Sequence, residues 1–202
     1  MNDCCLLIST SGAVPLLLHK LKPHNIVRFF HINTMNSINR FDGKWEFLSN
    51  FYPVLIEYQG IKYPSVEHYY VAQKCKNDQM VNGVYYTPSD FKEMISKRSN
   101  PGYVKKIGQK MKVRSDWDSK KLEFMNWGVR EKFKNEELKE LLLSTDNLML
   151  IEGNFWHDNF YGQCSCIKCA NKGQNHLGKI LMKIRDELRG VENKTGLEEF
   201  FN

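Results

Sequence analysis

The chain has 202 residues, of which 42% are hydrophobic and 26% charged, enough to bury one sizeable core and typical of one domain. Its 29 Lys and Arg outnumber 23 Asp and Glu, and the net charge of +6 favours an anionic partner, either a phosphorylated small molecule or nucleic acid. No apolar run approaches the roughly 20 residues of a membrane-spanning helix, so we expect no membrane partner. The oligomeric state stays open.

The two ends of the chain are expected to lie outside the domain. Residues 1–34 show neither helical nor strand periodicity, which predicts a poorly ordered extension, or sequence upstream of a start at Met35. This segment lacks the basic start and small-residue cleavage site of a signal peptide. The cysteines are not spread like those of a disulfide-stapled secreted domain, so a reducing cytoplasm is expected. The domain is predicted over 35–192, with a C-terminal tail over 193–202.

The first half of the domain should begin with strands and continue with helices. The aromatic and β-branched segment 44–64 contains a Gln59-Gly60 turn, which predicts short strands joined by a hairpin. Ser65 is the expected N-cap of a helix that runs to about Lys76. The polar segment that follows predicts two short helices, over 88–97 and 102–111.

The second half is predicted to be mostly helical. Asp116 or Asp118 can cap a long helix, and a second helix is expected over 135–145. The apolar run 148–154 predicts a buried strand, and apolar residues at helical spacing over 175–188 predict a final amphipathic helix. The predicted class is therefore α+β: a mostly helical single domain with a small β-sheet.

Glu67 is the first candidate for chemistry. It falls in the first turn of the helix capped by Ser65, where the helix dipole favours an anion and should lower its pKa. A purely stabilising role would explain Glu67 taken alone. Tyr70 and Lys74 share its face, however, and an acceptor, an aromatic ring and a cation in one stripe suit the wall of a pocket.

Two further stretches hold candidates. Trp117 stands at a helix start close to Arg114, where a tryptophan serves either as a core anchor or as a stacking platform for a ligand. The chain then leaves the predicted buried strand and places Glu152, Asp158 and Tyr161 in a loop. Asp158 fits a turn residue, but loops at strand ends are also where catalytic groups tend to lie.

The cysteine cluster raises the question of a metal. Cys164, Cys166 and Cys169 could hold Zn²⁺ with His157 or His176 as a fourth ligand. A strong zinc motif has two paired ligand sets, and only one is present. The sequence therefore predicts no metal and no cofactor, with structural zinc as the alternative.

Six blocks, in order, resemble the signature blocks of the NADAR superfamily and, within it, the YbiA-like N-glycosidases. They are "FLSNFYP", "YPSVEHYYVAQK", "SNPGYVKKIGQK", "RSDWDSKKLEFM", "LIEGNFWHDNFYG" and "GQNHLGKILMKIRDEL", and together they cover about residues 38–190. The resemblance implies a compact, mostly helical α+β fold with a cleft lined by charged and aromatic positions. Two departures could reshape that cleft: the cysteine loop replaces a glycine-rich stretch of many relatives, and 82–91 is the predicted insertion.

The resemblance also implies roles for individual residues. The family's functional glutamate, tryptophan and aspartate fall on Glu67, Trp117 and Asp158, which are the predicted catalytic residues. A family position that is usually tryptophan is Tyr161 here, which keeps an aromatic face and adds a hydroxyl. The predicted substrate-binding residues stack on the base, bind the phosphate or face the ligand: Tyr161, Tyr70, Lys74, Lys106, Arg114 and Asn175.

The activity implied by the resemblance is hydrolysis of an N-glycosidic bond. The expected substrates are early phosphoribosylamino-pyrimidine intermediates of riboflavin biosynthesis, which would yield ribose 5-phosphate and an aminopyrimidine. Carboxylates suit this reaction because one can stabilise the oxocarbenium-like ribose while another activates water, and we assign these roles to Glu67 and Asp158 respectively. The alternatives are removal of ADP-ribose from guanine in nucleic acid, bound by the lysines of 105–112, and a non-catalytic reader of ADP-ribose or nucleotides.

Overall fold

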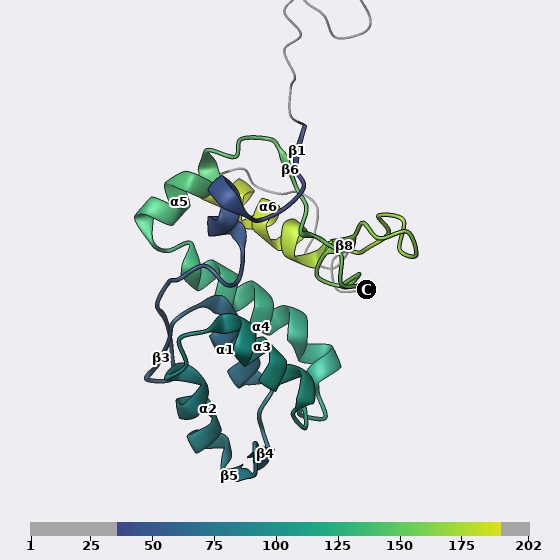
Figure 1. Ribbon diagram of the computed structural model, residues 1–202. Coiled ribbons are helices and arrows are strands. Elements are labelled where there is room, and N and C mark those ends of the chain that lie inside the picture. Colours follow the sequence, from purple (N-terminus) through teal and green to yellow (C-terminus); the bar gives the residue numbers. More distant parts are fainter. Residues whose placement is uncertain (1–35, 191–202) are drawn as a thin grey trace, which may run out of the picture. The chain divides into compact units, whose positions relative to one another are not determined.

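The computed structural model describes residues 36–190, and the predicted extension over 1–34 and tail over 193–202 lie outside the described residues. Helices are the main regular structure in this part of the chain (Figure 1). In order they are the 3₁₀ helix η1 (Gly43–Leu48) and the α-helices α1 (Val66–Gln73), α2 (Pro88–Ser96), α3 (Pro101–Lys110), α4 (Trp117–Lys132), α5 (Glu136–Leu143) and α6 (His176–Leu188).

The strands of the described residues form four separate pairs instead of the single small sheet that was expected. Two pairs are antiparallel hairpins, β2 (Ile56–Tyr58) with β3 (Ile61–Tyr63) and β4 (Gln79–Val81) with β5 (Val84–Tyr86). Two are parallel and join distant segments, β1 (Ser37–Ile38) with β6 (Met149–Leu150) and β7 (Gly153–Asn154) with β8 (Gln163–Cys164). The α+β class is confirmed.

Helix α1 is the centre of the core, and all eight of its residues are buried. Helices α2, α3 and α4 pack against it (Figure 1). Two glycines set how closely they approach: a Cβ on Gly108 of α3 would lie 2.9 Å from the Val71 side chain, and one on Gly128 of α4 would lie 2.7 Å from that of Tyr69. Any larger residue at these two positions would push a neighbouring helix away from α1.

Several local predictions are confirmed. The Ser65 side chain accepts a hydrogen bond from the backbone N–H of His68 and caps α1. Gln59 and Gly60 both adopt positive φ at the turn between β2 and β3. The segment 82–91 includes the turn and second strand of the β4–β5 hairpin, where Asn82 also has positive φ; that it is an insertion stays a prediction.

Two local predictions are wrong. The strand expected from Lys44 is the 3₁₀ helix η1, because the consecutive residues Phe47 and Leu48 are both buried and a strand would turn one of them outward. Asp116 occupies the N-cap position of α4, but its side chain makes no capping hydrogen bond. Its carboxylate instead accepts two hydrogen bonds from the Arg114 guanidinium, at 2.5 and 2.8 Å.

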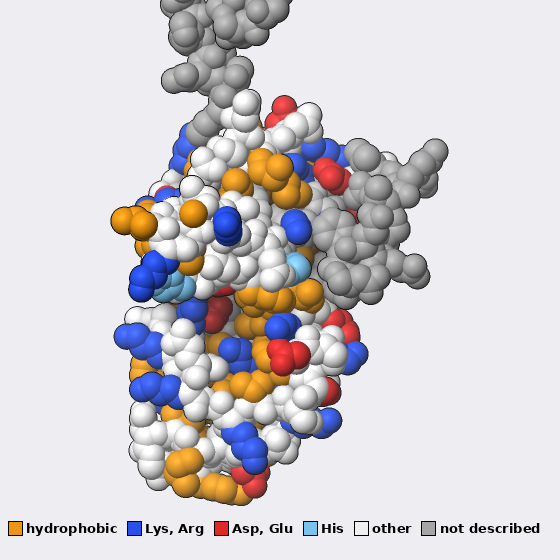
Figure 2. All heavy atoms as spheres, turned by 90° about the vertical axis from the view of Figure 1, so that its right-hand side faces the viewer, with side chains coloured by type: hydrophobic (Ala, Val, Ile, Leu, Met, Phe, Trp, Pro, Cys, Tyr) orange, Lys and Arg blue, Asp and Glu red, His pale blue; other side chains and the backbone are white. Residues whose placement is uncertain are grey.

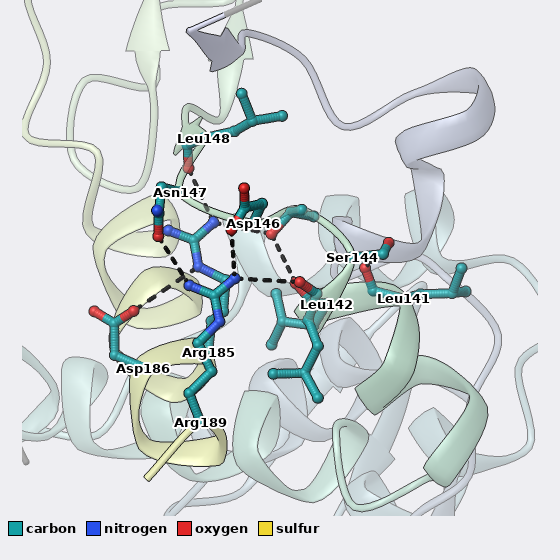
Figure 3. Close-up of polar contacts among 11 residues, drawn as sticks. Leu141, Leu142, Ser144, Asp146, Asn147, Leu148, Arg185, Asp186 and Arg189 are labelled. Carbon is teal, nitrogen blue, oxygen red and sulfur yellow. Dashed lines mark hydrogen bonds and ion pairs between the residues drawn. The ribbon is translucent and has the colours of Figure 1, made fainter. Parts of the chain in front are cut away.

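Helix α6 is tied to the turn before β6 by two arginines (Figure 3). Buried Arg185 donates from Nη1 to Thr145 Oγ1 and to the Leu148 carbonyl, both at 2.9 Å. Arg189, which is more exposed, donates to the Leu143 carbonyl at 3.2 Å. These bonds hold the start of β6, and therefore the segment that follows it. No helix in 36–190 is long and apolar enough to cross a membrane.

The buried arginine should contribute far more to stability than its neighbour. Replacing Arg185 by Met keeps the apolar stem but leaves the Leu148 carbonyl without this donor, and should lower the free energy of unfolding by about 2–4 kcal/mol. Arg189→Met is the control and should cost under about 1 kcal/mol, because Asp146 and Asn147 are exposed and water can replace the donor at the partly exposed Leu143 carbonyl. Urea denaturation measures both, and equal losses would contradict this account.

Candidate active site

A cavity of about 470 Å³ is lined by residues from α1, α3 and α4 and from the segments around β1 and β7. Figure 2 shows acidic and basic side chains beside hydrophobic ones in a hollow of the surface. The wall contains four carboxylates, four cations and a group of aromatic rings. In that order they are Asp42, Glu67, Glu152 and Asp158; Arg40, Lys74, Lys105 and Lys121; and Phe41, Phe51, Tyr70, Trp117, Trp156, Phe160 and Tyr161.

Glu67 reaches this cavity from the first turn of the buried helix. Glu67 is only 8% exposed, and its backbone N–H donates to the Asn50 carbonyl at 3.0 Å. Burial raises its pKa, which Lys105 and Lys74 partly offset. The expectation of a lowered pKa is therefore wrong, because removal from water outweighs the helix dipole at this position. Glu67 is a carboxylate held beside cations, in a site where its charge is costly.

Asp158 is both a turn residue and part of the cavity wall. Its Oδ1 accepts hydrogen bonds from the backbone N–H groups of Phe160 and Tyr161, at 3.1 and 2.9 Å. Asn154 fixes its backbone by donating to the Asp158 carbonyl at 2.7 Å and accepting from the Asp158 N–H at 3.1 Å. These bonds hold the carboxylate in one orientation toward the cavity, so the two readings of Asp158 are compatible.

Glu152 is a third carboxylate, which the sequence placed in the same loop but not among the chosen site residues. Burial raises its pKa to about 7, with Asp158 and Glu67 adding to the rise and Lys105 opposing it. Its Oε2 is buried and has no hydrogen-bond partner among residues 36–190. Glu152 can therefore hold or release a proton near neutral pH.

Lys132 is a buried cation that interacts with Glu152, and burial shifts its pKa downward. It is only 1% exposed, its Nζ donates to the Ser49 carbonyl at 2.7 Å, and burial lowers its pKa to about 7. The charge of Glu152 raises the pKa of Lys132, and Lys132 lowers that of Glu152. Each group therefore favours the charged form of the other, although burial disfavours both.

An aromatic wall faces the carboxylates. The hydroxyls of Tyr70 and Tyr161 share a hydrogen bond of 2.5 Å, which joins α1 to the loop after β7. The Trp117 ring lies 5.0 Å from that of Tyr70 and stacks on Phe124 at 5.9 Å. Burial raises the pKa of both tyrosines, which keeps them protonated. The hydroxyl of Tyr161 therefore has a structural use, since it joins the loop after β7 to α1.

The lysines divide between the cavity and the outer surface. The Lys105 Nζ lies 5.4 Å from the centre of the Trp156 ring, at the cavity wall. The Lys74 Nζ donates to the Gly108 carbonyl at 3.2 Å, and burial lowers its pKa. Lys106 is exposed and does not line the cavity. Adjacent side chains on a helix point about 100° apart, so only one of the two lysines can face the cavity. That residue is Lys105, and not Lys106 as predicted.

Of the nine predicted site residues, the structure brings six to the cavity: Glu67, Trp117, Asp158, Tyr161, Tyr70 and Lys74. Arg114 and Asn175 join Lys106 outside the lining residues. Arg114 is engaged with Asp116. Asn175 is buried and donates to the Leu150 carbonyl while accepting from the Glu152 N–H, so it positions the Glu152 backbone. Lys105, Lys121 and Trp156 also line the cavity but were not among the nine, although each lies within a quoted family block.

The cysteine loop also gathers side chains that could hold a metal. The ligand atoms of His157, Cys164, Cys166 and Cys169 all lie within 4.8 Å of one another. His176 is not part of this group; its Nε2 is 2.6 Å from Gln174 Oε1. Of the two histidines that the sequence offered as a fourth ligand, the geometry therefore favours His157.

Taken together, the fold and cavity define a class: an α+β domain that can hold a ring-bearing, anionic small molecule against several carboxylates. Residues 38–189 match the family model of the NADAR domain, and the chain belongs to the NADAR family. The family resemblance predicted from the sequence is thereby confirmed.

Named relatives and a solved structure support this assignment. The chain is 35% identical over 155 residues to N-glycosidase Npun_R5314 of Nostoc punctiforme, covering 75% of this chain and 90% of that protein. It is 29% identical over 175 residues to N-glycosidase YbiA of Escherichia coli, covering 82% and 97%. The NMR structure of the E. coli protein YbiA superposes with a TM-score of 0.62 and 27% identity, covering 81% of this chain and 93% of that one.

A further relative has a different name. The chain is 33% identical over 155 residues to the riboflavin biosynthesis protein VVA0006 of Vibrio vulnificus. That match covers 73% of this chain and 37% of the relative. The family domain is therefore one part of a longer chain in that protein.

The raised pKa of Glu152 predicts a pH-dependent cost to stability. The folded protein binds this proton more tightly than the unfolded chain, so the contribution of Glu152 to stability falls as pH rises from about 4.5 to about 7. Glu152→Gln removes this charge. The difference in free energy of unfolding, variant minus natural chain, should therefore be more favourable to the variant at pH 8 than at pH 5, by about 1–3 kcal/mol.

Urea titrations at pH 5 and pH 8 measure this difference. The exposed Glu140→Gln on α5 is the matched control and should show no comparable change between the two pH values. A Glu152→Gln variant that differs from the natural chain by the same amount at both pH values would contradict the prediction.

Proposed function

We propose that this NADAR protein is an N-glycosidase that hydrolyses early phosphoribosylamino-pyrimidine intermediates of riboflavin biosynthesis, releasing ribose 5-phosphate and an aminopyrimidine. The observation that carries the proposal is the convergence of Glu67, Glu152 and Asp158 on one cavity with aromatic and lysine walls. The names of the relatives support both parts: two are N-glycosidases and one is a riboflavin biosynthesis protein.

The cavity suits a substrate of this size and chemistry. Its volume of about 470 Å³ lies within the range usual for small-molecule sites. Trp117 and Tyr161 offer ring faces and edges for the pyrimidine, and the ammonium groups of Lys74 and Lys105 offer charge for the phosphate. Because Lys74 is bonded inside the fold, Lys105 is the more available of the two for a ligand.

The proposed reaction breaks the C1′–N bond and forms a C1′–O bond to water. Asp158, oriented by two backbone N–H groups, accepts a proton from the attacking water. Glu67, whose negative charge Lys105 and Lys74 favour, stabilises the oxocarbenium-like ribose. Glu152, with its pKa near 7, donates a proton to the departing nitrogen of the aminopyrimidine. The net reaction consumes one water and releases both products without any cofactor.

Removing either of the two principal carboxylates should abolish most of the activity. Glu67→Gln and Asp158→Asn preserve shape, and each should lower kcat by about 100-fold or more because general acid–base and electrostatic catalysis are worth that much. The assay follows ribose 5-phosphate released from the early intermediates by mass spectrometry, with circular dichroism to establish folding. Glu140→Gln, the same exchange on the surface, should retain full activity.

Two results would overturn the assignment. Near-normal turnover in both folded variants would remove Glu67 and Asp158 from the reaction. Release of ADP-ribose from ADP-ribosylated guanosine DNA, without release of ribose 5-phosphate from the intermediates, would favour a nucleic-acid substrate, for which the lysines along α3 offer a backbone contact. Silence on both substrates would favour a binding role.

The two neighbouring lysines of α3 provide a matched pair for the phosphate. Lys105→Ala should raise KM for the phosphorylated intermediate by about tenfold to 100-fold, the value of one charge-assisted hydrogen bond to phosphate. Lys106→Ala removes the same charge from the same helix but outside the cavity, and should change KM by less than about twofold. Equal effects from the two variants would show that general electrostatic attraction, and not a phosphate contact, explains both.

A further inference from the structure

The loop between β7 and α6 brings one nitrogen and three sulfurs to a single point. His157 Nδ1 lies 3.3 Å from the Cys169 Sγ, 3.4 Å from that of Cys166 and 4.0 Å from that of Cys164. Tetrahedral zinc with Zn–S of about 2.3 Å and Zn–N of about 2.0 Å would place its ligand atoms roughly 3.5–3.8 Å apart. The observed separations agree with that geometry.

Disulfide chemistry does not account for the same cluster. All three cysteines are free, and an odd number of thiols cannot be paired within the group. Three sulfurs and one imidazole form instead a donor set that favours Zn²⁺ and leaves no open coordination position.

The surroundings of the cluster are those of a prepared metal site. Asn159 Nδ2 donates to the Cys169 Sγ at 3.1 Å, the kind of outer hydrogen bond that orients a thiolate ligand. His157 adopts a left-handed backbone conformation with φ of 66°, which costs a non-glycine residue about 1 kcal/mol or more. Ligation of its Nδ1 would offset that cost. The imidazole then carries its proton on Nε2.

Hydrogen bonds within the loop and to Asn154 and Asn159 support it, but few of its side chains are buried. Between Ser165 and Gln174 every residue is exposed or partly exposed, and the Ile167 side chain is 100% exposed. A segment with so few buried apolar groups has a small hydrophobic contribution to its order. A metal that joins both ends of the loop can supply that order, as structural zinc does in small domains.

We propose that His157 Nδ1 and the thiolates of Cys164, Cys166 and Cys169 bind one Zn²⁺ in a closed, structural site. Cys164 belongs to β8 and His157 immediately precedes Asp158, so the metal ties the end of this strand to the turn behind the cavity wall. The metal stands outside the cavity and takes no part in bond cleavage. Its existence is independent of the substrate proposed above, and only an effect on activity would depend on that function.

Metal content tests the proposal directly. The full chain, with any affinity tag removed and no zinc added, should contain about one zinc per molecule by inductively coupled plasma mass spectrometry. Cys166→Ser and His157→Ala should each lower that value by about tenfold after dialysis against a metal-free buffer. Replacing zinc by Co²⁺ should give the visible bands and the sulfur charge-transfer band of a tetrahedral thiolate site, and Cys166→Ser should weaken that charge-transfer band.

One cysteine variant and one histidine variant serve as matched controls. Cys75→Ser removes a thiol that lies in the core, and His176→Ala removes the other histidine of the region; both should keep the metal. Trypsin supplies an independent readout, because chelation should accelerate cleavage after Lys168 and Lys172 in the loop by about tenfold or more.

Three outcomes would overturn the proposal. Protein with less than about a tenth of a zinc per molecule and no cobalt charge-transfer band would show that the cluster does not bind metal. Zinc retained in His157→Ala but lost in His176→Ala would exclude His157 as the ligand. Cleavage of the loop at the same rate with and without chelator would exclude a structural role.

Discussion

The burial of α1 on every side is the constraint on which the rest of the structure depends. A helix enclosed by three others can carry a carboxylate only if that residue opens onto a cavity and has cations nearby. Glu67 meets both conditions, with Lys74 on its own helix and Lys105 on α3. Gly108 and Gly128 allow the enclosing helices to lie this close. The packing of the core and the placement of the candidate site are thus one arrangement.

The opposite wall of the cavity depends on short connections instead of a helix. The β1–β6 pair and the Arg185 bonds hold the chain before Glu152, and Asn175 holds the Glu152 backbone from the start of α6. Asn154 then fixes the Asp158 turn, and the Tyr70–Tyr161 hydrogen bond closes this wall onto α1. The backbones of Glu152 and Asp158 are therefore positioned by two different asparagines.

The sequence predicted most elements because their local signals were strong. Ser65 as a cap, Gln59-Gly60 as a turn and the apolar stripe of α6 each depend on neighbouring residues alone. The errors came from tertiary packing. Two adjacent buried side chains made η1 a 3₁₀ helix, and Arg114 diverted Asp116 from capping α4.

The site shows the same division between local and distant effects. Glu67 and Asp158 were recognisable from family blocks, but the choice of Lys105 over Lys106 depends on which side of α3 faces α1. The raised pKa of Glu67 depends on how completely its helix is enclosed, and a capping motif alone suggests the opposite. The selection of His157 over His176 likewise depends on how the loop folds back on β8. None of these facts is encoded in residue spacing.

Burial of the ionisable groups around the cavity costs stability, and the proposed function offers a reason for their presence. A fold under pressure for stability alone would replace Glu152 and Lys132 by apolar residues, since burial shifts the pKa of each toward its neutral form. Their shifts bring both groups into the pH range where proton transfer is easiest. The same low-dielectric surroundings that make these charges costly also strengthen their action on a developing cation. The destabilisation and the proposed catalytic power therefore have a single physical cause, the burial of these groups in the protein.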